Sequence, residues 1–389
     1  MPSVPSNANP VMLKWARERA GMDVDVVAKA ERLQANNLAA WERGEGTPSY
    51  AMLVRLAKRY NRPLMVFYLP APPTDFQVAN EFRVLAGYTE RSESPAVRRT
   101  IEDVHERLAW ASDFIEENGE AACPVVASLA SESSIRNAAA HLRSHLGVRV
   151  QDQIACPTSA AAFKLWRTQC EALGVFVFQT GNIAKDGIRG IAFCDKFAPA
   201  VVVNTKELFE ARVFTMIHEL VHIALGQSAV TTFSGRDNRA IERYCDAVAA
   251  ETLVPTEDLM RRLPEIRGQD FEETATRIAA VYKVSRLAAL IKLVEIKAVT
   301  WRDLRKKWSV YTAAPTQTTK KQFGPRQPHK STLNRLGFSF TRLAVSAYDA
   351  GEIHGAGLTE LLAGMKLKHL PKLLKAVFPN RIQPSTAVN

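Results

Sequence analysis

The sequence of 389 residues predicts an α+β protein that is mainly helical and contains one small β-sheet. Through most of the chain, apolar residues recur at three- and four-residue spacing, which is the period of a helix with one buried side. Three short apolar runs typical of strands all fall between residues 175 and 204. Stretches rich in Pro, Gly and polar residues divide the chain into five predicted parts: 1–70, 71–130, 131–300, 301–331 and 332–389.

Composition argues against several classes of protein. No apolar run reaches the length of about 18 residues that a membrane-spanning helix needs. The N-terminus lacks the basic-then-apolar pattern of a secretory signal. The five cysteines form no C-x-x-C pair, which is typical of reduced thiols in a cytoplasm. These features predict a cytoplasmic protein with no membrane segment.

The net charge of +11 is unevenly distributed. Residues 297–389 contribute +12 and residues 10–70 contribute +4, so the rest of the chain carries −5. Two basic ends around an acidic middle indicate contact with nucleic acid at the ends. For the C-terminal part, solubility without any partner explains the charge equally well.

Residues 10–69 predict five short helices with recognisable starts and stops. Gly21 ends the first helix, Asp23 caps the second and Ser49 caps the fourth. The expected helices cover Leu13–Ala20, Asp23–Ala30, Gln34–Glu42, Ser49–Tyr60 and Pro63–Phe67. The stretch from Ala39 to Ser49 and the apolar residues after it resemble the phage-repressor (XRE-type) helix-turn-helix family. The resemblance covers this whole part of the chain and implies a DNA-binding domain.

By this resemblance the recognition helix spans residues 34–41. Amide side chains can hydrogen-bond the edges of adenine in the major groove, and three of them face outward here: Gln34, Asn36 and Asn37. Arg43 and Arg32 are placed to reach phosphates. Arg32, however, stands where a small turn residue is usual, and the recognition helix contains no Lys or Arg. A role in docking another protein therefore stays open beside DNA binding.

The middle of the chain predicts further helices over 97–118, 132–146 and 163–173, of which the first bridges the two halves. Strands are expected over 175–179, 190–194 and 199–204. A sheet here suits a peptidase, because an extended peptide can add to its edge. His141 and His145 have no acid between them, so we interpret them as surface or interface histidines.

The dominant motif is His218-Glu219-Leu220-Val221-His222, the H-E-x-x-H signature of zinc peptidases. Residues 207–225 predict a half-buried helix that ends before Gly226. Histidines four residues apart project from the same face of a helix, so their imidazoles can bind one metal ion. Glu219 is then placed to act as general base on a water at the metal.

A catalytic zinc site needs a third protein ligand, and a second predicted helix offers one. Glu242 and Asp246 share a face of the helix that runs to about Leu253. We predict that Glu242 is the third ligand and that Asp246 accepts the N–H of a ligating histidine; a solvated helix face is the alternative. Cys245 lies about 100° from Asp246 around the helix, so we interpret it as a packed residue and not as a ligand.

Residues 163–255 resemble the ImmA/IrrE family of metallopeptidases. The matching stretches, in order, are Phe163–Trp166, Leu173–Val175, Arg189–Ala192, Ala198–Asn204, Phe214–His222 and Glu242–Pro255. The resemblance implies a zincin-like domain of the gluzincin type and an endopeptidase that uses Zn²⁺. In such enzymes the partner is a repressor or antitoxin-like protein, removed in a stress, phage or mobile-element switch. A helix-turn-helix domain fused upstream is common in that family.

The C-terminal part predicts a helical region over 276–296 with a turn at Val284-Ser285, a flexible linker over 312–331 and a basic helical bundle over 333–378. The bundle carries no evident chemistry.

The predicted function is a zinc endopeptidase with a DNA-binding domain at residues 10–69. Two alternatives remain: a regulator that uses the peptidase fold as a sensor, or one component of a toxin–antitoxin pair. Tyr244 and Tyr282 are candidates for stabilising an oxyanion, and homodimer formation stays open.

Overall fold

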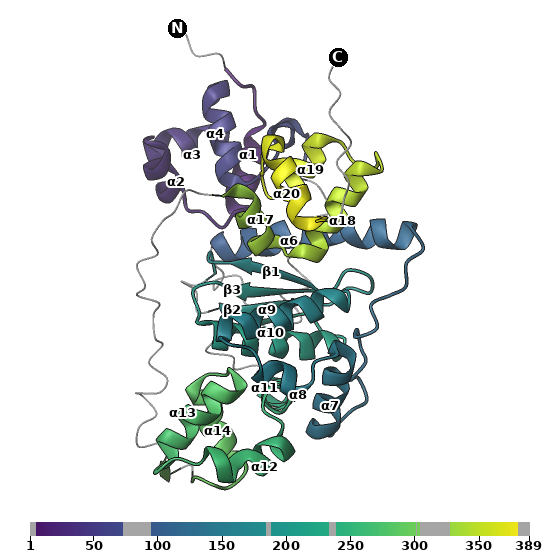
Figure 1. The fold of residues 1–389 in the computed structure, drawn as a ribbon. Coiled ribbons are helices and arrows are strands. Elements are labelled where there is room, and N and C mark those ends of the chain that lie inside the picture. Colours follow the sequence, from purple (N-terminus) through teal and green to yellow (C-terminus); the bar gives the residue numbers. More distant parts are fainter. Residues whose placement is uncertain are drawn as a thin grey trace. The chain divides into compact units, whose positions relative to one another are not determined.

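The computed structural model describes residues 5–72, 95–183, 188–232, 239–300, 302–303 and 327–379. The chain forms two compact units, Met1–Glu106 and Arg107–Asn389 (Figure 1). The division falls inside one long helix, α6 (Pro95–Glu117), which corresponds to the predicted bridging helix. Among the described residues, no helix is long and apolar enough to cross a membrane.

The first unit contains the five predicted helical segments in their predicted order. They are α1 (Pro10–Arg19), α2 (Val24–Glu31), α3 (Ala35–Arg43), α4 (Tyr50–Tyr60) and η1 (Leu64–Tyr68). The fifth segment is a 3₁₀ helix and not an α-helix. Ser49 caps α4 as expected, since its side chain accepts a hydrogen bond from the backbone N–H of Met52. Leu38, Leu53 and Leu56 are fully buried in the small core of this unit.

Arg32 lies in the turn between α2 and α3 and adopts the left-handed conformation there. Arg32 has a φ of 56°, a left-handed conformation that side chains other than Gly adopt at some cost. The first unit also extends past residue 70, because it includes the first part of α6 as far as Glu106. Arg98 donates to the carbonyl oxygens of Glu18 and Arg19 at the end of α1, and Arg62 pairs with Glu102 at 2.8 Å.

The second unit is built around a four-stranded sheet in the order β1-β3-β2-β4. The strands are β1 (Phe176–Thr180), β2 (Ile188–Phe193), β3 (Ala200–Asn204) and β4 (Ala229–Thr232). β1 and β3 are parallel, whereas β2 is antiparallel to both β3 and β4. The sequence predicts the first three strands to within two residues. It misses β4, a strand of four residues directly after the metal-motif helix.

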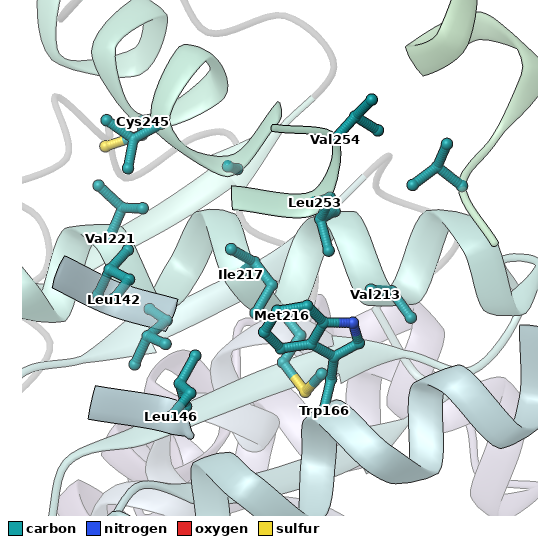
Figure 2. Close-up of a cluster of buried hydrophobic side chains, with 14 of the residues drawn as sticks. Leu142, Leu146, Trp166, Val213, Met216, Ile217, Val221, Cys245, Leu253 and Val254 are labelled. Carbon is teal, nitrogen blue, oxygen red and sulfur yellow. The ribbon is translucent and has the colours of Figure 1, made fainter. Parts of the chain in front are cut away.

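Helices cover both faces of this sheet. On one face lie α9 (Ser159–Ala172) and α10 (Phe209–Ala224), whose apolar sides share one core with Val177, Val201 and Val203 of the sheet. Figure 2 shows Trp166 of α9 together with Met216 and Ile217 of α10 in that core. On the other face, Phe340 packs edge-on against Phe176 and Phe178.

The remaining helices surround this centre. They are α7 (Ile135–Leu146), α8 (Val150–Ile154), α11 (Arg239–Leu253), α12 (Thr256–Ile266), α13 (Phe271–Tyr282) and α14 (Arg286–Glu295). The predicted helical region over 276–296 is two helices, and Ser285 caps the second one by accepting from the N–H of Ala288. The sequence does not predict α8, which has only five residues, or α12, which contains Pro264, a residue that normally argues against a helix interior.

The C-terminal helices belong to the second unit. They are α17 (Pro328–Leu336), α18 (Phe338–Asp349), α19 (Gly355–Leu361), η3 (Leu367–His369) and α20 (Leu370–Val377). α17 packs against β1, where the carbonyl of Asn334 accepts hydrogen bonds from Gln179 and Arg167 at 2.7 and 3.0 Å. The predicted linker over 312–331 is therefore wrong for residues 328–331, which are helical because Pro328 is well suited to the first turn. Its residues up to 326 lie outside the described part of the chain.

Candidate metal centre

The H-E-x-x-H motif lies in the buried second half of α10. His218, Glu219 and His222 are 3%, 0% and 2% exposed. The helix is held on one side by the sheet and on another by α11. It ends where Gly226 adopts a φ of 76°, in the left-handed region that suits Gly after a helix. The motif is thus fixed between packed elements, which is what a rigid metal site requires.

Three donor groups converge beside this helix. Nε2 of His218 and Nε2 of His222 are 3.2 Å apart. The Glu242 carboxylate, which α11 contributes, lies 3.3 Å from the first nitrogen and 3.4 Å from the second. Among the described residues these three form the cluster of His, Cys, Asp and Glu side chains whose ligand atoms lie close enough to hold a metal ion.

The spacing of these donors fits a tetrahedral ion. Bond lengths of 2.0–2.1 Å to nitrogen and oxygen place adjacent ligands of a tetrahedron about 3.3 Å apart. The two histidine nitrogens, 3.2 Å apart, agree with that value, and each of the two Glu242 carboxylate oxygens lies within 3.4 Å of one of these nitrogens. Two imidazoles and one carboxylate also leave a fourth position for water or substrate. The residues present therefore fit a catalytic divalent metal such as zinc.

The two histidines have different partners on their outer nitrogens. Nδ1 of His218 lies 3.0 Å from a carboxylate oxygen of Asp246, the contact predicted for that residue. Nδ1 of His222 lies 3.7 Å from the sulfur of Cys245. Cys245 is fully buried, and Figure 2 shows it facing Val221 of α10. It is a packed residue as predicted, but it also contacts the second histidine, which the sequence analysis missed.

The electrostatics of the cluster favour an ionised Glu242 beside a protonated His218, whose proton a metal ion would have to displace. Burial lowers the pKa of His218, but hydrogen bonding to Asp246 and Glu242 outweighs this and raises the pKa to about 10. Burial raises the pKa of Glu242, and the two histidines outweigh that effect and lower the pKa to about 2. The Glu242 carboxylate is thus ionised at neutral pH, the form in which it binds a metal. Burial, together with nearby carboxylates, raises the pKa of Cys245, so its thiol stays neutral.

Glu219 lies against the backbone of β2 at Gly190. A Cβ atom on Gly190 would lie 2.8 Å from Cγ of Glu219 and 2.6 Å from Cγ2 of Thr215, and would overlap the Glu219 carboxylate. Only a residue without a side chain lets this carboxylate sit so close to the strand. Next to it, Thr215 donates to Glu207, which also pairs with Arg189 of β2 at 3.0 Å.

Two tyrosines and two histidines do not join the cluster. The hydroxyl of Tyr244 donates to the carbonyl of Glu132, and that of the fully buried Tyr282 donates to Asp258, both at 2.7 Å. Both hydroxyls therefore serve contacts elsewhere, and neither tyrosine supports an oxyanion role in this arrangement. His141 and His145 of α7 stack on each other, with ring centroids 4.1 Å apart.

In the first unit, the predicted DNA-contacting residues are at the surface. Gln34 precedes α3 as its N-cap, and Asn36 and Asn37 are exposed in its first turn. Arg43 is exposed at the end of α3, but its guanidinium forms two hydrogen bonds with Glu45 at 2.9 and 2.7 Å. An exposed pair of this kind contributes little stability, so a phosphate can displace Glu45.

A buried H-E-x-x-H helix with a carboxylate from the next helix defines a metallopeptidase-type domain. Comparison with family models agrees: residues 170–294 match a peptidase family described as the IrrE N-terminal-like domain, and residues 13–67 match a helix-turn-helix family. The chain therefore carries an IrrE N-terminal-like peptidase domain behind an XRE-type helix-turn-helix domain, the fusion that the sequence predicts. A search of curated proteins found no match to the chain.

Proposed function

We propose that the protein is a zinc-dependent endopeptidase whose substrate is a partner repressor or an antitoxin-like protein. The convergence of His218, His222 and Glu242, whose ligand atoms lie close enough to hold one metal ion, is the observation that carries the proposal. All three ligand positions and the adjacent Glu219 are intact, which favours an active enzyme over a sensor that has lost its chemistry. The regulatory setting, a stress, phage or mobile-element switch, follows from the resemblance of both domains.

The chain supplies binding and proton transfer to this reaction. When bound, the metal supplies Lewis acidity that polarises the substrate carbonyl and lowers the pKa of a water towards neutrality. His218, His222 and Glu242 would hold it, and Asp246 and Cys245 would orient the two imidazoles. Glu219 would accept a proton from the attacking water and donate it to the nitrogen of the leaving amine.

The test is a cleavage assay combined with metal analysis. We expect about one zinc per chain, lost in the His218→Ala/His222→Ala variant because one carboxylate cannot hold the ion alone. Glu219→Gln should keep the zinc and reduce turnover of a candidate repressor by about 10²–10⁴-fold or more, since an amide cannot accept the proton. Stoichiometric zinc in the double variant would show that the metal binds elsewhere. Wild-type turnover by Glu219→Gln would show that Glu219 is not the general base.

The helix-turn-helix domain binds DNA in this proposal, and Asn36 and Asn37 read bases. Asn36→Ala or Asn37→Ala should relax base preference at one or two positions of a selected duplex, at a cost of roughly 1–3 kcal/mol there. Arg43→Ala should weaken binding to all sequences alike, because it contacts phosphate. If the intact protein selects no sequence from a random duplex library at low salt, the domain is better understood as a protein-docking module, which the absence of Lys and Arg from residues 34–41 favours.

A further inference from the structure

The last two helical segments of the chain carry a row of exposed lysines. Lys368 in η3 and Lys372 and Lys375 in α20 follow one another at spacings of four and three residues, so they lie on one side of these turns. We call these three residues the lysine stripe. The opposite side of α20 holds Leu373 and Val377, which are 0% and 5% exposed. α20 is therefore docked by its apolar side and presents the stripe to solvent.

The segment that carries the lysine stripe contains no acidic residue of its own. Residues 361–379 contain no Asp or Glu, and Lys366 adds a further exposed positive charge next to the stripe. None of the ion pairs between described residues involves these lysines, whereas Lys292 of the same unit is paired with Glu251. Unpaired like charges on one helix face repel each other, so their clustering favours an anionic partner.

The surroundings of the lysine stripe identify the kind of anion. A helix that inserts into a membrane surface needs a free apolar face, but that face of α20 is buried in the protein's own bundle. Single-stranded nucleic acid is held by aromatic side chains on which bases stack. Phe378, directly after α20, is half-buried, and its ring centroid lies 5.5 Å from the guanidinium of Arg342. What remains is a row of point charges suited to the phosphates of a duplex.

We propose that the lysine stripe is a second nucleic-acid surface, which binds the phosphate backbone of double-stranded DNA without reading its sequence. The choice of DNA over duplex RNA rests on the proposed DNA-binding role of the helix-turn-helix domain. The phosphate-binding role of the stripe does not depend on it. The stripe also gives the basic C-terminal part of the chain a function distinct from solubility.

The test measures the salt dependence of binding by the full-length protein to a labelled duplex of random sequence. Each phosphate contact contributes about −0.9 to the slope of log K against log salt. Lys368→Gln/Lys372→Gln/Lys375→Gln should therefore flatten the slope by about 2.7 units and weaken binding at low salt. A matched control, Lys164→Gln/Lys206→Gln/Lys297→Gln, removes three scattered exposed lysines of the same unit and should leave the slope unchanged.

Several outcomes would overturn the proposal. The stripe does not contact DNA if the stripe variant and the control have equal slopes, or if the stripe variant loses binding only to vesicles containing phosphatidylserine. A duplex RNA that shows the full lysine-dependent slope while DNA shows none would replace DNA as the partner. If the triple variant unfolds at a lower temperature than the wild type, the single variant Lys372→Gln provides the test. It should flatten the slope of log K against log salt by about 0.9, and an unchanged slope would refute the proposal. Asn36→Ala alters sequence preference but not this slope, so failure of the helix-turn-helix proposal is seen separately.

Discussion

Replacement of Gly190 by Ala should impair catalysis while the metal site stays intact. The added Cβ would lie 2.8 Å from Cγ of Glu219 and 2.6 Å from Cγ2 of Thr215. Carbon atoms in contact normally lie about 3.5–4.0 Å apart, so one side must move by about 1 Å. The backbone of β2 is held by hydrogen bonds to β3 and β4 on its two sides. The side chain of Glu219 is less constrained than this backbone, so the side chain is the part that should move.

A displacement of about 1 Å at a catalytic group can cost about 10²-fold in rate, which corresponds to about 2.7 kcal/mol in the activation barrier. We therefore expect kcat of Gly190→Ala to fall about 100-fold. Overpacking should also cost about 1–3 kcal/mol of stability. Zinc content should not change, because the ligand nitrogens of His218 and His222 face Glu242 of α11 and not β2.

The assay compares turnover of a cleaved repressor, zinc content and thermal unfolding for three variants. Gly357→Ala is the matched control, because a Cβ there meets its nearest atom, on Ile353, at an ordinary 3.8 Å. Thr215→Ser in the Gly190→Ala background removes the colliding methyl, keeps the hydroxyl that donates to Glu207, and should restore part of the activity. Wild-type kcat in a folded Gly190→Ala protein would refute the argument, and loss of zinc would show that β2 positions the whole helix.

Two further predictions concern α11. Cys245→Ala should weaken zinc binding about 10-fold, because Nδ1 of His222 loses the thiol beside it; the affinity is measured by competition with a chromophoric chelator. Cys245→Ser should lose less affinity for zinc than Cys245→Ala. Wild-type affinity in both variants would show that the thiol only fills space. Glu251→Gln should cost about 3 kcal/mol at neutral pH, since it leaves the buried Lys292 with one carboxylate partner fewer. Burial raises the pKa of Glu251, but hydrogen bonds from Lys292 and Thr256 outweigh burial and lower the pKa. The stabilisation by ionised Glu251 is therefore fully present above the ordinary glutamate pKa of 4.5 and is lost as pH falls through the lowered pKa. The difference in melting temperature between wild type and Glu251→Gln should therefore vanish in acid, and a difference that persists there would point to packing instead.

The elements that the sequence predicts well are those with a strong local signal. The periodic apolar residues of α10 and the Ser and Gly residues that bound the helices place each of these elements to within a few residues. β4 has four residues and no turn residue of its own, so its pairing with β2 decides its structure. The helical start of α17 at Pro328 was assigned to a linker, because composition alone cannot show that Asn334 accepts hydrogen bonds from the sheet.

The cluster of His218, His222 and Glu242, which we propose as the metal-ligand set, can be inferred from the sequence because helical spacing is a local rule, whereas the contacts around it depend on how separate elements pack. Spacing places Glu242 and Asp246 on one face, but it cannot decide which histidine Asp246 contacts. That choice depends on the crossing of α10 and α11, which also brings Cys245 to His222, although Cys245 lies about 60° around the helix from Glu242. Gly190 is harder still to find, because its importance lies in an absent side chain next to a residue 29 positions later. The sequence Arg189–Ala192 predicts a strand with one position that has no side chain. Only the folded structure shows that the carboxylate of Glu219 occupies the space beside that position.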